Sequence, residues 1–207
     1  MASASAVPEA TREVGAHEHR IEERREPRYT LLLRQAKLRT RDAEYLCVIR
    51  DVSTSGLRVR TFHALPPGDR FAIELRDGCP YPVEKVWEQD GEAGFRFRSP
   101  VALDELLRDD ERFPRRPMRV AMDMPVSLTS EGQAGKAHLT NLSQQGARLE
   151  TDRFLARGQL VRLEGMHLPM LHAKVRWRRD FTHGVVFEET FAFRDFAFLL
   201  ERLQTAR

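Results

Sequence analysis

The sequence repeats itself at a spacing of about 90 residues, and this limits the chain to architectures built from two similar units. The segment Asp51–Gly56 (DVSTSG) corresponds to Asn141–Gly146 (NLSQQG), at an offset of 90. Three further pairs match at the same offset: Trp87 and Trp177, Gly94 and Gly184, Phe97 and Phe187. A fixed internal period is typical of duplicated structural units. We therefore predict two homologous domains in this chain of 207 residues.

The unit boundaries follow from a second repeated element and from composition. A cluster R-R-x-x-R occurs at Arg24–Arg28 and again at Arg115–Arg119, at an offset of 91. A break between the units is expected near Phe113-Pro114. Residues 1–20 are small, polar and without period, so we predict a disordered tail there. The expected domains are residues 21–112 and 113–207.

Each unit is predicted to be mainly β. Apolar residues alternate with polar ones over short segments separated by Gly and Pro, as at Phe71, Ile73 and Leu75 after Pro66-Pro67-Gly68. A period of two indicates half-buried strands, and short strands at regular spacing favour a small closed barrel. The predicted strands are 45–52, 56–61, 71–75, 83–88 and 94–98 in the first unit, and 138–142, 147–151, 159–164, 171–178 and 184–188 in the second.

A helix is predicted after each barrel. Residues 101–112 and 191–203 carry apolar side chains at a spacing of three to four, and the second segment is rich in phenylalanine. The simpler role for the second helix is a lid on its own barrel. The other role is a surface for a partner or for a homodimer.

Composition excludes several classes of protein. The formal net charge is only +3, and general nucleic-acid binders usually have a large basic excess, so we expect no nucleic-acid partner. No apolar run is long enough for a membrane span, and the first residues do not resemble a secretory signal. Two cysteines, Cys47 and Cys79, are too few for a disulfide framework. A cytoplasmic protein is therefore expected.

The arginine clusters suit an anionic ligand. Residues four apart in an extended segment share one side, so the first and last arginines of each cluster can converge. Guanidinium groups bind phosphate oxygens and the O6/N7 edge of guanine, and they stack on purines. A single cluster of this kind is more often a solvated set of arginines paired with neighbouring glutamates. Its repetition before a matching second motif favours a binding role.

The second motif, [D/N]-x-S-x-x-G, lies where one strand ends and the next begins. Asp, Asn and Ser commonly bond the backbone at a turn, and Gly allows positive φ or close approach. The motif alone is therefore a good turn sequence. An Asp or Asn oxygen can also accept from the N–H edge of guanine, which either residue permits. The chain has no Walker or Rossmann fingerprint and no nucleophile–base set, so we expect a binding protein and not an enzyme.

The two motifs in this order, twice, resemble the PilZ domain, a bacterial receptor for the second messenger cyclic di-GMP. The segments Trp87…Gly94–Phe97 and Trp177…Gly184–Phe187 resemble its closing strands. The resemblance covers nearly all of residues 21–207. It implies two consecutive six-stranded antiparallel β-barrels, each followed by a C-terminal helix, with cyclic di-GMP on the outer surface of the barrel.

The resemblance also implies the site residues. The ligand-binding set is Arg24, Arg25, Arg28, Asp51, Ser53 and Gly56 in the first unit, and Arg115, Arg116, Arg119, Asn141, Ser143 and Gly146 in the second. The glycines would allow close approach of the ligand. No catalytic residue, metal or cofactor is expected.

The expected output is a ligand-induced change in domain arrangement, or binding of a downstream protein. The alternative is a PilZ-like scaffold that binds proteins and no nucleotide. A third hypothesis is a nucleic-acid binder, which the arginine content and a pI near 9.1 would favour.

Overall fold

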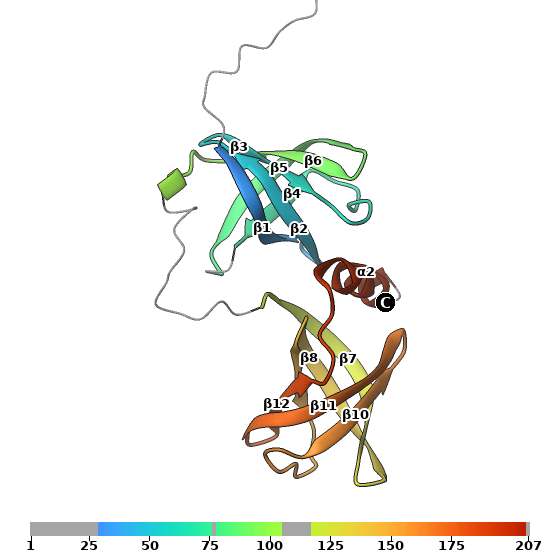
Figure 1. The fold of residues 1–207 in the computed structure, drawn as a ribbon. Coiled ribbons are helices and arrows are strands. Elements are labelled where there is room, and N and C mark those ends of the chain that lie inside the picture. The colour runs from blue at the N-terminus through green and yellow to red at the C-terminus, as the bar shows by residue number, and fades with distance from the viewer. Residues whose placement is uncertain (1–28, 76–77, 105–116, 206–207) are drawn as a thin grey trace, which may run out of the picture.

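The computed structural model describes residues 29–75, 78–104 and 117–205 (Figure 1). They form two closed antiparallel β-barrels of six strands each, with one α-helix after the second. The expected fold class is therefore confirmed. In the described part of the chain, no helix is long and apolar enough to cross a membrane.

The first barrel closes in the order β1-β2-β3-β6-β5-β4. Its strands are β1 (Tyr29–Arg39), β2 (Glu44–Val52), β3 (Gly56–Arg60), β4 (Arg70–Glu74), β5 (Pro80–Gln89) and β6 (Glu92–Phe97). Leu38 pairs with Ile73 where β1 meets β4, and this contact closes the barrel. Closure leaves each strand with two neighbours, so no edge in the sheet is exposed.

The second barrel repeats this connectivity, in the order β7-β8-β9-β12-β11-β10. Its strands are β7 (Arg119–Ser130), β8 (Gln133–Ser143), β9 (Gly146–Glu150), β10 (Leu160–Gly165), β11 (Leu168–Arg179) and β12 (Thr182–Phe187). Leu163 pairs with Leu128 where β10 meets β7. The 90-residue repeat in the sequence thus corresponds to a repeated fold.

Each barrel has its own apolar core. Alternate residues of the strands point inward, as Leu57 and Val59 do on β3 and Ala147 and Leu149 do on β9. This burial reproduces the period of two in the sequence. Leu46, although it lies on β2 of the first barrel, belongs to the core cluster of the second.

The helix of the second unit, α2, spans Phe193–Thr205. Phe196, Leu199, Leu200 and Leu203 are buried on one face, in agreement with the predicted helix over 191–203. In the segment 101–112, where the first helix is expected, residues 101–104 are described, and of these Leu103 and Asp104 are helical. The remaining positions, 105–112, lie outside the described residues, as do residues 1–20 of the expected tail.

Helix α2 lies between the two barrels (Figure 1). It packs into the core of its own barrel and also contacts β2 of the first. The Gln204 side chain donates to the Glu44 carbonyl at 2.9 Å and accepts from the Glu44 backbone N–H at 2.8 Å. Phe62 and Phe193 meet edge to face, with ring centroids 5.6 Å apart. The helix therefore covers its own barrel, as the simpler role proposed, and also joins the two units.

Candidate functional site

In the first unit, Asp51 of the D-x-S-x-x-G motif forms an ion pair. Asp51, near the end of β2, is buried and pairs across the sheet with Arg58 on β3. Its Oδ2 accepts from Arg58 Nε at 2.7 Å. The same guanidinium also donates to Oε2 of Glu92 on β6, at 3.3 Å. Two carboxylates therefore neutralise Arg58.

Ser53 and Gly56 form the tight turn between β2 and β3. The Ser53 N–H donates to the Gly56 carbonyl at 2.7 Å, and the Gly56 N–H donates to Ser53 Oγ at 3.2 Å. A Cβ on Gly56 would lie 2.5 Å from the Phe95 carbonyl oxygen of β6. The glycine is therefore needed so that β3 and β6 can approach. Its expected role of admitting a ligand stays a prediction.

The second unit builds the same turn. Ser143 Oγ donates to the Gly146 carbonyl at 3.0 Å, and a Cβ on Gly146 would overlap the Val185 carbonyl of β12. Arg119, the last arginine of the second cluster, starts β7 directly opposite Ser143. The last arginine of the second cluster thus lies next to the turn motif of the same unit.

The charge balance at this position differs between the units. Arg148 corresponds to Arg58 and pairs across the sheet with Asn141, which corresponds to Asp51. The counterpart of Glu92 is Thr182. The two carboxylates beside Arg58 are therefore replaced by neutral residues beside Arg148. Among the described residues, no acidic side chain pairs with Arg148, which leaves its guanidinium available to an anion.

A tryptophan completes this surface. Trp177 on β11 lies over Gly184 on β12, because a Cβ on that glycine would overlap the indole. Trp87 lies over Gly94 in the same way. This packing explains why the Trp and Gly pairs recur together in the sequence. The Trp177 side chain remains about one-third exposed, so part of its ring is open to a planar ligand.

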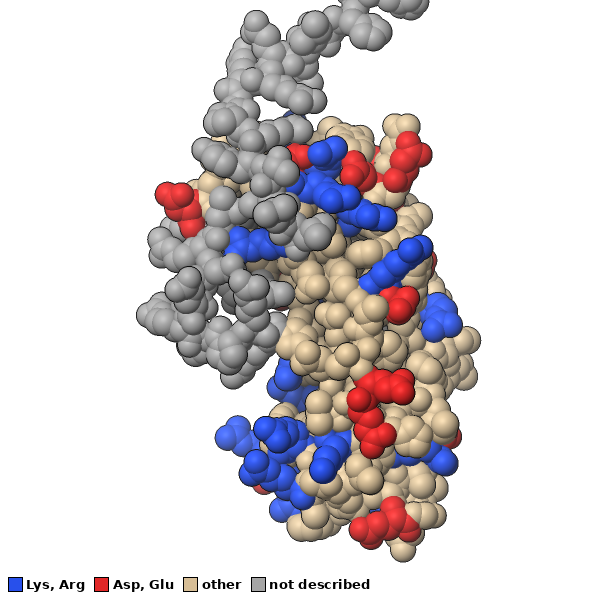
Figure 2. Space-filling model, viewed as in Figure 1, with Lys and Arg blue, Asp and Glu red and all other residues tan. Residues whose placement is uncertain are grey.

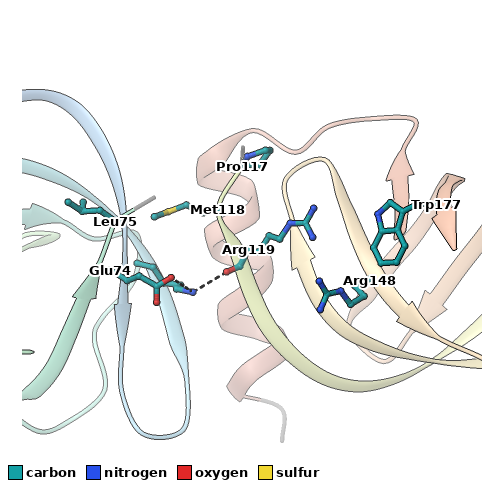
Figure 3. Close-up of a pocket in the computed structure, with 8 residues that line it drawn as sticks. Glu74, Leu75, Pro117, Met118, Arg119, Arg148 and Trp177 are labelled. Atoms are coloured by element: carbon teal, nitrogen blue, oxygen red, sulfur yellow. Dashed lines mark hydrogen bonds and ion pairs between the residues drawn. The ribbon is translucent and has the colours of Figure 1, made fainter. Parts of the chain in front are cut away.

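Arg119, Arg148 and Trp177 line a cavity of about 460 Å³ (Figure 3). Pro117 and Met118 complete the wall from the second unit, and Lys37, Glu74 and Leu75 line it from the first barrel. Figure 3 shows the two guanidinium groups on the same side of the second barrel. The volume is in the ordinary range for small-molecule sites. The cavity therefore lies at the junction of the two barrels.

Lys37 lines this cavity from the first barrel. Its buried ammonium group pairs with Glu44 at 3.2 Å and with Glu74 at 3.1 Å. It also donates to the Arg119 carbonyl at 3.1 Å, across the junction of the barrels (Figure 3). Glu44 Oε2 accepts from the Ala121 N–H at 2.9 Å. The first barrel thus holds the start of β7, where the arginine cluster ends.

The described residues include seven of the twelve predicted site residues: Asp51, Ser53, Gly56, Arg119, Asn141, Ser143 and Gly146. Arg24, Arg25, Arg28, Arg115 and Arg116 lie outside the described residues. Reasoning from sequence missed Lys37 and Arg148, and it used Trp177 only as a marker of the closing strands. Arg148 had a signal, since Arg58 matches it at the offset of 90.

A family model for the PilZ domain matches residues 22–113 and again residues 107–195. The chain belongs to the PilZ family. It contains two PilZ domains in tandem, which confirms the resemblance seen in the motifs. No curated protein matches the chain.

Solved structures with two-domain coverage are similar to this PilZ protein at low identity. PlzA of Borreliella burgdorferi, solved in complex with c-di-GMP, is 14% identical with a TM-score of 0.36, over 83% of this chain and 88% of PlzA. YcgR of Escherichia coli, also solved with c-di-GMP, is 12% identical with a TM-score of 0.32, over 84% and 83%. The inhibitor of motility MotI of Bacillus subtilis is 15% identical with a TM-score of 0.35, over 85% and 97%.

Proposed function

We propose that this protein is a receptor for cyclic di-GMP and that its principal site is the cavity between the barrels. The identity of the proposed ligand is supported by the chain's membership of the PilZ family. The proposed location of the site is supported by the comparison of Arg148 with Arg58. Asn141 and Thr182 stand beside Arg148 where the first unit has two carboxylates. An arginine without an acidic neighbour can bind phosphate or the O6/N7 edge of guanine.

The other groups at the cavity fit the rest of the ligand. Arg119 supplies a second guanidinium, and the exposed part of the Trp177 ring offers a plane for a guanine base. Asn141 and Ser143, next along the same turn, carry oxygens that accept from guanine N1–H or N2–H₂. Arg115 and Arg116 are proposed to contribute further cations. Among the described residues of the cavity we identify no nucleophile–base set, so the proposal is binding without turnover.

The first unit is proposed as the weaker site. Its Arg58 is already paired with Asp51 and Glu92, so binding an anion there requires one of these pairs to break. Arg24, Arg25 and Arg28, with Asp51, Ser53 and Gly56, remain the proposed residues of this site. The two sites should then differ in affinity.

The position of the main site suggests how binding is signalled. A ligand in the cavity would touch Arg119 and Arg148 of one barrel and the Lys37–Glu74 surface of the other. A ligand that contacts both barrels favours the arrangement that lets it do so. We therefore propose that cyclic di-GMP changes or fixes the arrangement of the domains, which a downstream protein then recognises.

Calorimetric titration tests this function, with GTP and cyclic di-AMP as controls. We expect selective binding of cyclic di-GMP in two phases of different affinity. Alanine at both Arg28 and Arg119 should remove both phases. Unchanged binding in that variant would show that the arginine assignment is wrong. Identical small-angle scattering with and without ligand would contradict the domain rearrangement.

A further inference from the structure

A second cavity, on the second barrel, shares Trp177 with the cavity between the barrels. Its volume is about 630 Å³, and it is lined by three arginines and two aromatic residues: Arg157, Arg176, Arg178, Phe154 and Trp177. Of the residues that the structure describes, neither an Asp nor a Glu lines it. Figure 2 shows Lys and Arg side chains gathered on the side of the second barrel where Figure 1 places β11 and β12. None of the three arginines lines the cavity between the barrels.

The aromatic residues here are open to solvent. Phe154 is 74% exposed, and the Arg178 guanidinium lies over its ring, 4.1 Å from the centroid. An arginine stacked on an aromatic ring is held in a fixed orientation and presents its outer face to a further planar group. The site thus combines flat surfaces for stacking with cations around them.

The first barrel provides an internal comparison for this surface. The positions of Phe154, Arg176 and Arg178 correspond to Ala64, Val86 and Glu88 in the first unit. Glu84 likewise corresponds to Lys174. Both units belong to one sequence and one fold, so a general bias of the chain toward arginine does not explain the difference. The basic and aromatic side chains are specific to the second unit.

From this geometry we infer that the surface around Phe154 and Arg178 binds single-stranded nucleic acid. Cations for the phosphates together with aromatic planes for unpaired bases are what such a ligand requires. The small net charge of the whole chain predicts no nucleic-acid partner, but that charge is unevenly distributed: residues 113–207 hold 15 Lys and Arg against 10 Asp and Glu, and residues 1–112 hold 19 against 21. The inference does not depend on the proposed cyclic di-GMP function.

The test uses the full chain and a fluorescein-labelled oligothymidylate of about 16 nucleotides, the upper end of the usual site size for one small barrel. Fluorescence anisotropy is measured over a range of salt concentrations. Wild-type protein should bind at low salt, and binding should weaken as salt rises. Alanine at Arg157, Arg176 and Arg178 together should lower the slope of log K against log salt by about 2, since each phosphate contact contributes roughly 0.7.

A matched control variant loses the same three positive charges as the triple alanine variant, but at positions outside the second cavity. Alanine at Arg70, Arg96 and Arg162 removes three exposed arginines outside the cavity. This control should keep wild-type binding. The Phe154→Ala variant tests stacking, and should weaken binding about 5- to 150-fold at an unchanged salt slope. Titration of each variant with cyclic di-GMP checks that the fold and the other site are intact.

Several results would overturn the inference. They are no binding by the wild-type protein at low salt, an equal loss in the control, or no effect of Phe154→Ala. Polyglutamate or a DNA duplex that competes as well as the single strand would also overturn it, because neither offers unpaired bases. Loss of oligothymidylate binding with cyclic di-GMP binding retained would separate the two sites.

Discussion

The Lys37 ammonium group of the first barrel donates a hydrogen bond to the backbone carbonyl of Arg119 in the second, at 3.1 Å. The two residues are 82 positions apart in the chain. One binds Glu44 and Glu74 within its own barrel, and the other ends the second arginine cluster. The ion-pair network of one domain is therefore connected directly to the proposed ligand site of the other.

Removing Lys37 should destabilise the protein. In Lys37→Met, two largely buried carboxylates lose a partner, while Arg39 still pairs with both. We expect a loss of about 3 kcal/mol in the free energy of unfolding, the lower end of the range for breaking a buried ion pair. Urea unfolding in a Trp177→Phe background measures it, because Trp87 of the first barrel is then the remaining tryptophan.

Arg98→Met, also in the first barrel, is the control for that measurement. Arg98 pairs with Glu84 at 3.3 Å, but the two side chains are 44% and 36% exposed. Such pairs contribute less than about 1 kcal/mol. An equal effect of the two substitutions would contradict the buried role of Lys37.

Placing carboxylates around Arg148, as the first unit has around Arg58, should weaken ligand binding at the second unit. In the double variant Asn141→Asp, Thr182→Glu, Arg148 gains the two acidic neighbours that Arg58 has. A loss of one arginine contact lowers affinity by about 5- to 150-fold. We expect a decrease in that range for the tighter calorimetric phase, and a similar decrease for Arg148→Ala.

The reciprocal exchange is its control. Asp51→Asn with Glu92→Thr frees Arg58 and should strengthen the weaker phase without changing the tighter one. If the double variant at 141 and 182 binds as the wild type does, the charge difference between the units does not determine their affinities.

Gly146→Ala should destabilise the second barrel. The added methyl group would overlap the Val185 carbonyl, and a backbone atom in a closed barrel cannot move aside as a side chain can. Overpacking of this kind costs about 1–3 kcal/mol. The neighbouring Gln145→Ala, at an exposed side chain, should change stability by less than about 0.5 kcal/mol. Thermal unfolding without ligand compares them, and equal midpoints would contradict the packing role of the glycine.

The stability of the second barrel should decrease in mild acid because of His183. Burial lowers the pKa of this imidazole below its ordinary value of 6.5. Its Nδ1 lies 3.1 Å from the Phe181 carbonyl, and its buried Nε2 has no hydrogen-bond partner among the described residues. The unfolded chain therefore binds the proton more readily than the folded protein. The stabilisation is present above pH 6.5 and is lost as pH falls toward the lowered pKa.

His183→Ala tests this prediction, since Ala93 stands at the equivalent position of the first barrel. Between pH 7 and pH 5 the variant should lose less stability than the wild type, measured by urea unfolding at each pH. The exposed His172→Ala should follow the wild-type curve. Parallel curves for wild type and His183→Ala would contradict the role of burial.

Much of each barrel could be predicted from the sequence because burial has a direct pattern there. Strands β3 and β9 alternate strictly, and Gly and Pro mark the turns. Strands β1 and β7 were not identified from pattern, although Val120 and Met122 on β7 are buried alternately. The sixth strand was expected only from the resemblance.

The junction between the barrels could not be predicted in this way. Leu46 has the same local pattern as any inward-facing residue, yet it packs with the core of the other unit. Lys37 is a single charged residue within a strand, with no local sign that it lies beside Glu74 and Arg119. Contacts between the barrels depend on how the surfaces of two folded domains fit together. The periodicity of a single segment carries no information about that fit. Comparison of the two repeats would have identified Arg148.

The packing of α2 against β2 also sets an order of assembly. N-terminal domains generally fold first during synthesis. The first barrel can close with its own strands, but Glu44 meets Gln204 only after another 160 residues have been made. At roughly 5–20 residues per second, that delay is about 8–32 seconds. For that interval, a nascent chain therefore lacks the groups that cover Leu46 and the Lys37 ammonium group in the finished protein.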